Sequence, residues 1–384
     1  MMSYQHIGQR LRLARELAKM TQTEAARSLG VAPATVNQYE SGKRRVEALT
    51  LEQLGRLYGV PLRYFFGEDT PLAEWEEALR LKAQDVPSEG KRGIGRVVQK
   101  VHDLEELYRV TKTPIPGVPH QPFAPLPEVA FSDEDVAELA ERTRRHFDLG
   151  LAPLLDLRGF LEGQGYHVFA VPLGTGDGQL SGFSFVHPDL GPVIVLNEDQ
   201  AWSRRPFTIA HEMAHRLFHY DRTVILSRMT DDRLLETFAE SFASHFLIPR
   251  EALHERLRAH GARTLARPED VVRLARYFGV SYGAMLSTLR KERRLAGDPQ
   301  HFNDVRPVTL ARTLGYRTIP YELGVRPLPP EERLPRIFLE LAYRAMADGQ
   351  LSLRRVADLF GISDLELQDQ LRPEADELAE DVYA

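Results

Sequence analysis

A run of six prolines divides this chain of 384 residues. The prolines lie between residues 114 and 127. Because proline fixes φ and lacks a backbone donor, this stretch cannot form a helix. We expect it to be an extended spacer or a strap over the surface of a domain. A chain of this length is expected to hold two or three domains, and we place one boundary here.

The amino-acid composition limits the classes of protein to which this chain can belong. Apolar residues make up 43% of the chain and charged residues 27%, which is typical of a soluble globular protein. Cysteine is absent, so any metal must be held by His, Asp or Glu. No apolar run is long enough to cross a bilayer, and the amino terminus has no secretory signal. These features predict a cytoplasmic protein without a membrane partner.

Charge is distributed unevenly along the chain. The formal net charge is −6, yet residues 1–66 carry ten Lys and Arg against five Asp and Glu. The amino-terminal segment, called the head below, is therefore basic, and the rest of the chain is acidic. This difference indicates that the head contacts phosphates. A chance excess of positive charge is the alternative.

The hydrophobic patterns predict a mainly α fold with a small antiparallel sheet, in the α+β class. The head, residues 4–66, is expected to form five short helices, the last of them at Leu62–Phe66. Gly-rich turns separate three strand-like runs at residues 167–171, 182–186 and 193–197. Helical patterns resume from residue 204.

The motif His211-Glu212-x-x-His215 lies on one of these expected helices. Residues four apart share a helix face, so the two imidazoles can bind one zinc ion. Glu212 lies beside the first ligand, where its carboxylate can act as a general base on water. The flanking residues are apolar, and a buried helix that carries such polar groups requires a functional reason. A chance match on an exposed helix is the alternative.

A third protein ligand is expected from the next apolar helix, where Glu236 and Glu240 lie four residues apart. We assign Glu236 as the ligand and Glu240 as a neighbour that orients a histidine ring. Either glutamate could instead be a solvated helix charge. His219 extends the histidine row and could be a ligand, a transition-state donor or a core histidine, and we favour the last two. The expected metal is Zn²⁺, with Mn²⁺ as the alternative.

These elements together resemble the ImmA/IrrE metallopeptidases over roughly residues 135–295. The resemblance is carried by Val195-Leu196-Asn197, by the run from Arg205 to His215 with His219 after it, and by the run from Glu236 to Pro249. In that family a ligand Glu precedes an Ala-Asn pair, which implies that Glu236 is the ligand, although Glu240 stands where the family usually has Asn. The resemblance also implies a zincin-like fold and a narrow-specificity endopeptidase. Such enzymes typically cleave a helix-turn-helix repressor and relieve transcriptional repression under stress.

The basic head resembles the Xre/Cro repressor-type helix-turn-helix. The resemblance is carried by the runs 20–26, 29–31 and 34–44. Asn and Gln on the third helix can pair with adenine, while basic residues after it suit phosphate contacts. A dimerisation or docking module is the alternative, and a homodimer on a two-fold operator is expected. The candidate DNA contacts are Gln22, Thr35, Asn37, Gln38, Lys43 and Arg44.

The leading hypothesis is a DNA-binding regulatory zinc endopeptidase that cleaves a repressor-type protein or a partner. One alternative is a transcriptional regulator whose peptidase-like domain senses a ligand or metal without proteolysis. Another is an antitoxin-like interaction protein. The expected parts are a DNA-binding head at 1–68, a helical and Pro-rich linker at 69–130, a metallopeptidase domain at 131–298 and a helical C-terminal region of unknown role at 299–384.

Overall fold

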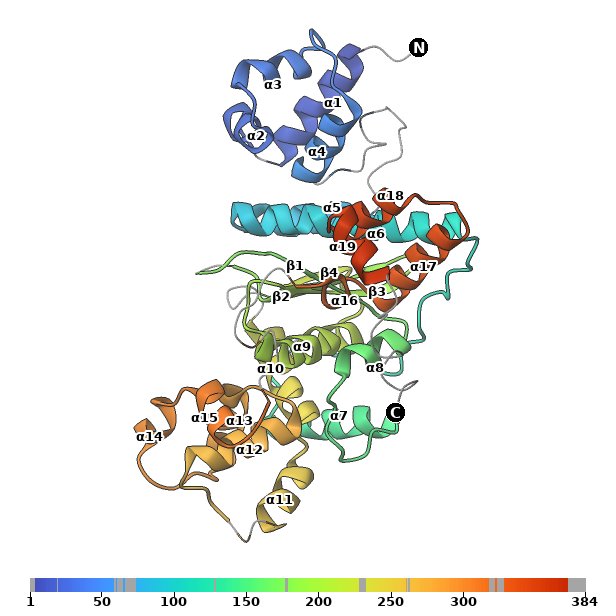
Figure 1. Cartoon of the computed structure of the whole chain (residues 1–384). Coiled ribbons are helices and arrows are strands. Elements are labelled where there is room, and N and C mark those ends of the chain that lie inside the picture. Colours follow the sequence, from blue (N-terminus) through green and yellow to red (C-terminus); the bar gives the residue numbers. More distant parts are fainter. Residues whose placement is uncertain are drawn as a thin grey trace, which may run out of the picture. The chain divides into compact units, whose positions relative to one another are not determined.

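A computed structural model describes most of the chain, and by their internal contacts the residues form two compact units (Figure 1). The first unit comprises Met1–Glu68, Gly95–Ile115 and Pro329–Ala384, and the second comprises Asp69–Ile94 and Pro116–Leu328. The three boundaries between the four parts expected from the sequence remain predictions. The described residues are 4–18, 20–58, 60, 65, 74–127, 129–176, 179–227, 233–259, 261, 263–317, 322 and 328–371.

The head of the first unit is built from four described helices, α1 (Tyr4–Leu17), α2 (Gln22–Leu29), α3 (Pro33–Glu40) and α4 (Ala48–Tyr58). Thr21 and Glu24 form a capping box at the start of α2, as expected. Gly30 ends α2 at φ 68°, a left-handed conformation that glycine adopts without strain. The expected fifth helix at Leu62–Phe66 lies largely outside the described residues.

A buried ion pair joins the first and third helices of the head. Arg15 Nη2 donates to Glu40 Oε2 at 3.0 Å, and both side chains are buried. Gln22 Nε2 donates to the same oxygen at 2.8 Å. The pair therefore fixes the orientation of α3 within the head.

The second unit contains a four-stranded sheet in the order β1-β3-β2-β4. The strands β1 (His167–Val171), β2 (Gly182–His187) and β3 (Gly191–Asn197) confirm the three expected strands, and β4 (Val224–Ser227) is additional. β2 pairs antiparallel with β3 and β4, but β1 pairs parallel with β3. The expected antiparallel sheet is therefore mixed, because the hairpin that follows β1 places β3 beside it in the same direction.

Helices cover both faces of this sheet (Figure 1). α9 (Arg205–Phe218) packs on β2 and β3, and α5 (Glu74–Lys82) packs on β4 and β2 from the other side. Trp75 of α5 stacks on Phe185 of β2 with ring centroids 5.1 Å apart. Residues expected as linker thus form part of the second unit.

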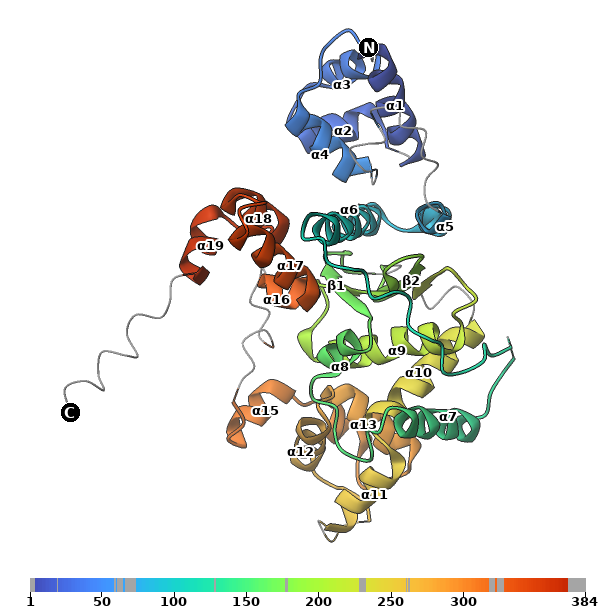
Figure 2. The same ribbon diagram turned by 90° about the vertical axis from the view of Figure 1, so that its right-hand side faces the viewer.

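Further helices pack on the side of α9 that faces away from the sheet (Figure 2). α10 (Arg233–Leu247) contacts both α9 and α7 (Asp133–His146). The Pro-rich segment crosses this surface, where Leu126 N donates to Phe218 O at 2.8 Å and Phe123 stacks on Phe218. Its expected role as a strap is confirmed.

Among the described residues, no helix is long and apolar enough to cross a membrane.

The other helices complete the two units. The remaining helices are α6 (Ser88–Val110), α8 (Leu157–Gly163), α11 (Arg250–Ala259), α12 (Pro268–Phe278), α13 (Tyr282–Lys291), α14 (Pro299–Asn303), α15 (Pro307–Thr313), α16 (Pro330–Arg333), α17 (Arg336–Ala347), α18 (Leu353–Phe360) and α19 (Asp364–Leu371).

Candidate metal centre

Helix α9 presents two buried histidines on one face. His211 and His215 are one turn apart and both are buried. Their Nε2 atoms lie 3.2 Å from each other. The four-residue spacing of His211 and His215 therefore brings the two rings together, as the sequence predicted.

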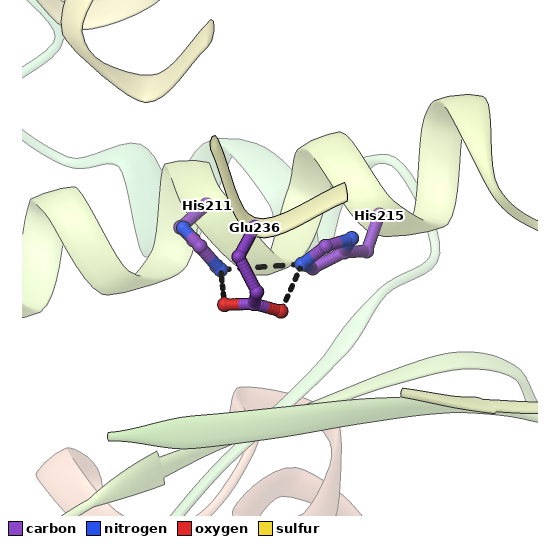
Figure 3. Close-up of side chains that lie close together, drawn as sticks. All are labelled: His211, His215 and Glu236. Carbon is purple, nitrogen blue, oxygen red and sulfur yellow. Dashed lines mark hydrogen bonds and ion pairs between the residues drawn. The ribbon is translucent and has the colours of Figure 1, made fainter. Parts of the chain in front are cut away.

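Glu236, in the first turn of α10, completes this point (Figure 3). Its Oε2 lies 3.2 Å from His211 Nε2, and its Oε1 lies 3.3 Å from His215 Nε2. Donors bound to one tetrahedral zinc at about 2.0–2.1 Å lie about 3.3 Å from each other. The nitrogen–nitrogen distance and the two nitrogen–oxygen distances are close to this value, the latter two through different oxygens of the Glu236 carboxylate. These three side chains therefore fit a zinc ion held by both rings and this carboxylate.

The protonation states of His215 and Glu236 favour metal binding. Burial lowers the pKa of His215 to about 3, so its ring is neutral near pH 7. Burial acts to raise the pKa of Glu236, but hydrogen bonds from His211 and His215 outweigh it and lower this pKa to about 2. Burial also opposes the charged form of His211, yet the neighbouring carboxylates raise its pKa above the ordinary value. The raised pKa of His211 shows that the carboxylates around this ring favour positive charge at this point.

Glu212 lies beside this group and points toward the sheet. Burial raises its pKa to about 7, although His211 and a hydrogen bond from Ser227 Oγ oppose the rise. Its Oε2 is buried and makes no hydrogen bond of good geometry among the described residues, although Ser184 of β2 lies close enough to help lower the pKa. A carboxyl group with a pKa near neutrality and one unused oxygen is suited to accept and return a proton.

Two residues that the sequence analysis did not identify shape the surroundings of Glu212. Ser227, at the end of β4, donates to Glu212 Oε1. Gly182 of β2 leaves room for the carboxylate, since a Cβ there would lie 2.7 Å from Val195 O and 3.2 Å from Glu212 Oε1. The apolar run Val224-Ile225-Leu226 is the sequence signal that could have indicated β4.

His219 and Glu240 are placed differently. His219 is buried at the end of α9, and its Nδ1 lies 3.1 Å from His215 Nδ1. This contact can fix the orientation of the His215 ring. Glu240 is exposed on α10, and its charge contributes to the raised pKa of His211. The expected orienting role of Glu240 stays a prediction.

Two segments of the chain match families of known proteins. Residues 161–290 match the family described as IrrE N-terminal-like domain, and residues 11–65 match the helix-turn-helix family. An uncharacterized HTH-type transcriptional regulator of Sinorhizobium fredii is 34% identical over 113 residues, which are 27% of this chain and 79% of that protein. The chain belongs to the family of HTH-type transcriptional regulators.

Two further regulators match over shorter stretches of the chain. One from Sinorhizobium medicae is 38% identical over 66 residues, which cover 17% of this chain and 47% of that protein. A transcriptional regulator of Rhodospirillum rubrum is 35% identical over 63 residues, or 16% of this chain and 58% of that protein. The chain thus spans about half the length of these two relatives.

The helix-turn-helix of this regulator presents its candidate DNA contacts on one helix and the turn after it. Asn37 and Gln38 of α3 are exposed, as are Lys43 and Arg44, whereas Thr35 is half-buried. The Arg44 guanidinium lies over the Tyr39 ring, 5.6 Å from its centroid, which restrains it near the end of α3.

Gln22 differs from these residues because its amide donates to Glu40 inside the head. An amide nitrogen carries two hydrogens, so the second one remains for a phosphate. A phosphate contact by Gln22 remains a prediction.

Proposed function

We propose that this regulator is a DNA-binding zinc endopeptidase that cleaves a repressor-type protein or a partner to control transcription in a stress response. The observation that carries the proposal is the grouping of His211, His215 and Glu236 beside the buried carboxyl group of Glu212. The two Nε2 atoms lie 3.2 Å apart, and each lies 3.2 to 3.3 Å from one oxygen of the Glu236 carboxylate. This donor set fits zinc, and Mn²⁺ is the alternative.

Each side chain has a distinct part in the proposed hydrolysis. Bound zinc would supply Lewis-acid polarisation of the scissile carbonyl and a lowered pKa for water. Glu212 takes a proton from the attacking water and returns it to the departing amine, for which a pKa near 7 is well matched. Ser227 fixes Glu212 Oε1 and leaves Oε2 for the water, while His219 orients His215.

A regulator that only senses a metal is the second candidate, but one observation favours the enzyme. A sensor requires the ligands but not Glu212, whose burial as an ionisable group is unfavourable. In this chain Glu212 is fully buried, and its carboxyl group interacts with the neighbouring ligand His211. Such an arrangement is expected where perturbed groups perform chemistry.

Cleavage of a helix-turn-helix repressor tests the proposal. We expect the zinc-loaded chain to cleave such a protein, and we expect Glu212→Gln to bind metal but to lose more than about 100-fold in rate, because the amide cannot act as a base. Mass spectrometry of the products reports both the cut and its rate. Equal rates for the wild type and the Glu212→Gln variant would show that Glu212 is not the base.

DNA binding by the head gives a separate prediction. Asn37→Ala and Gln38→Ala should each weaken binding by about 1–3 kcal/mol and relax sequence preference. Lys43→Ala and Arg44→Ala should weaken binding evenly across sequences and reduce the salt slope by about 1 each. Binding isotherms of the full chain at several salt concentrations measure both effects. Absence of salt-sensitive binding would instead make the head a docking module.

A further inference from the structure

Three corners of this chain join two short helices with the same backbone geometry. In the head, Gly30 between α2 and α3 adopts φ 68° and ψ 29°. Gly279 between α12 and α13 adopts φ 69° and ψ 27°, and Gly361 between α18 and α19 adopts φ 65° and ψ 40°. After each glycine, the next backbone N donates to a carbonyl oxygen five residues back, at 2.9 to 3.1 Å. The corner of the helix-turn-helix is therefore repeated at α12–α13 and at α18–α19.

The correspondence extends into the helix that follows each glycine. In all three corners this helix packs on the helix before the glycine. The sixth residue after the glycine is buried and the eighth is exposed. The buried residues are Val36, Met285 and Leu367, and the exposed residues are Gln38, Ser287 and Asp369. Helices α3, α13 and α19 therefore expose the same side relative to their corners.

The three corners differ in charge. Residues 250–296, which include α12 and α13, contain eleven Lys and Arg against five Asp and Glu, although the whole chain has a formal net charge of −6. This segment is as basic as the head, where residues 1–66 contain ten against five. Helix α19, in contrast, carries three acidic residues and no basic one. Only the corners α2–α3 and α12–α13 therefore suit a polyanion.

Three exposed arginines, Arg263, Arg290 and Arg293, form what we call the basic surface. Arg290 lies in the last turn of α13, and Arg293 follows this helix. Leu265 N donates to Arg294 O at 2.8 Å, so the segment that carries Arg263 lies beside the end of α13. The three guanidinium groups thus come from two segments that a backbone hydrogen bond joins.

The other charges at the end of α13 are offset locally. Lys291 interacts with the Asp133 carboxylate of α7, and Glu292 Oε1 accepts from Arg250 Nε at 2.9 Å. Arg290 differs because its Nη2 donates to the uncharged Asn303 Oδ1 at 2.6 Å. A guanidinium group has five donors, so this bond leaves Arg290 both its charge and further donors.

We propose that α12 and α13 form a second DNA-binding element, in which the basic surface contacts the phosphates of duplex DNA without reading its sequence. Ser287 stands at the position of Gln38, and Leu286, which stands at the position of Asn37, is buried. Helix α13 therefore lacks the exposed amides that could read base edges, and it offers mainly phosphate contacts. DNA binding by this element requires neither bound metal nor proteolysis.

Photo-cross-linking tests the placement of the DNA. The chain has no cysteine, so one introduced cysteine can carry a benzophenone to a chosen position. The full-length variants Gln38→Cys, Ser287→Cys and Asp369→Cys place it at the corresponding position of the three corners. With a labelled duplex of unrelated sequence, we expect cross-links from positions 38 and 287 and only background from position 369. A yield from Ser287→Cys no higher than that from Asp369→Cys would overturn the proposal.

Charge reversal tests the three arginines. The full-length triple variant Arg263→Glu, Arg290→Glu, Arg293→Glu should bind the same duplex more weakly and with a smaller salt dependence. Each lost phosphate contact should reduce the slope of log affinity against log salt by about 1, so the triple variant should lose about 3. Anisotropy titrations at several salt concentrations measure this slope.

A second triple variant controls for net charge. Arg109→Glu, Arg145→Glu, Arg354→Glu reverses three exposed arginines outside residues 250–296 and changes the net charge by the same amount. It should keep the slope of the wild type, and circular dichroism checks that both triple variants are folded. Equal slopes in the two folded triple variants would contradict the assignment of the basic surface.

Discussion

Replacing Glu236 by alanine is expected to cost this chain most of its metal affinity. Glu236 supplies the oxygen donors that face His211 Nε2 and His215 Nε2 at 3.2 and 3.3 Å. Its removal leaves two protein donors where a zinc site requires at least three. We expect a loss greater than the 10–100-fold range typical of residues that only orient a ligand. Competition with a metal chelator of known affinity measures the change.

Two neighbouring glutamates serve as matched controls for this measurement. Glu240→Ala should weaken metal binding by at most about 10–100-fold, because the residue is exposed and acts on His211 through its charge. Glu212→Gln should change affinity least, since it retains the shape of the side chain. If Glu240→Ala lost metal while Glu236→Ala kept it, the assignment of the ligand on α10 would be wrong by one turn.

Glu40→Ala is expected to unfold the head while leaving the second unit intact. Glu40 is buried, and both of its oxygens accept hydrogen bonds from Arg15. Removal of one partner leaves a buried guanidinium without its counter-charge, which typically destabilises a domain by about 3–5 kcal/mol. Hydrogen exchange of the full chain, followed by mass spectrometry, should show faster exchange confined to α1 through α4.

An exposed ion pair within α1 provides the control. Arg12 Nε donates to Glu16 Oε1 at 2.8 Å, and both side chains are largely exposed. Glu16→Ala should therefore leave hydrogen exchange in α1 through α4 close to that of the wild type. Comparable exchange rates in Glu40→Ala and Glu16→Ala would show that the buried pair does not stabilise the head.

The parts of the fold that could be predicted from sequence depend on short-range spacing. His211 and His215 meet because a helix places residues four apart on one face, and Thr21 caps α2 through a neighbour three residues on. Glu236 could be assigned as the third ligand from its place on the next apolar helix and from the resemblance to a family. The structure places its carboxylate beside both rings.

The parts that were not predicted depend on contacts between distant segments. Strand β4 is only four residues long, so it carries little periodic signal, and Ser227 at its end therefore was not recognised beside Glu212. The parallel pairing of β1 with β3 depends on chain topology rather than on local pattern. The packing of α5 on the sheet depends on Trp75 meeting Phe185, which local sequence does not indicate.

The most direct test of the central claim is the metal content of the purified chain. Elemental analysis after dialysis should find about one zinc or manganese ion per chain in the wild type and none in the double variant His211→Ala, His215→Ala. The helical content of the variant, read by circular dichroism, controls for folding. A folded double variant that retains a full equivalent of metal would contradict the site assigned to His211, His215 and Glu236.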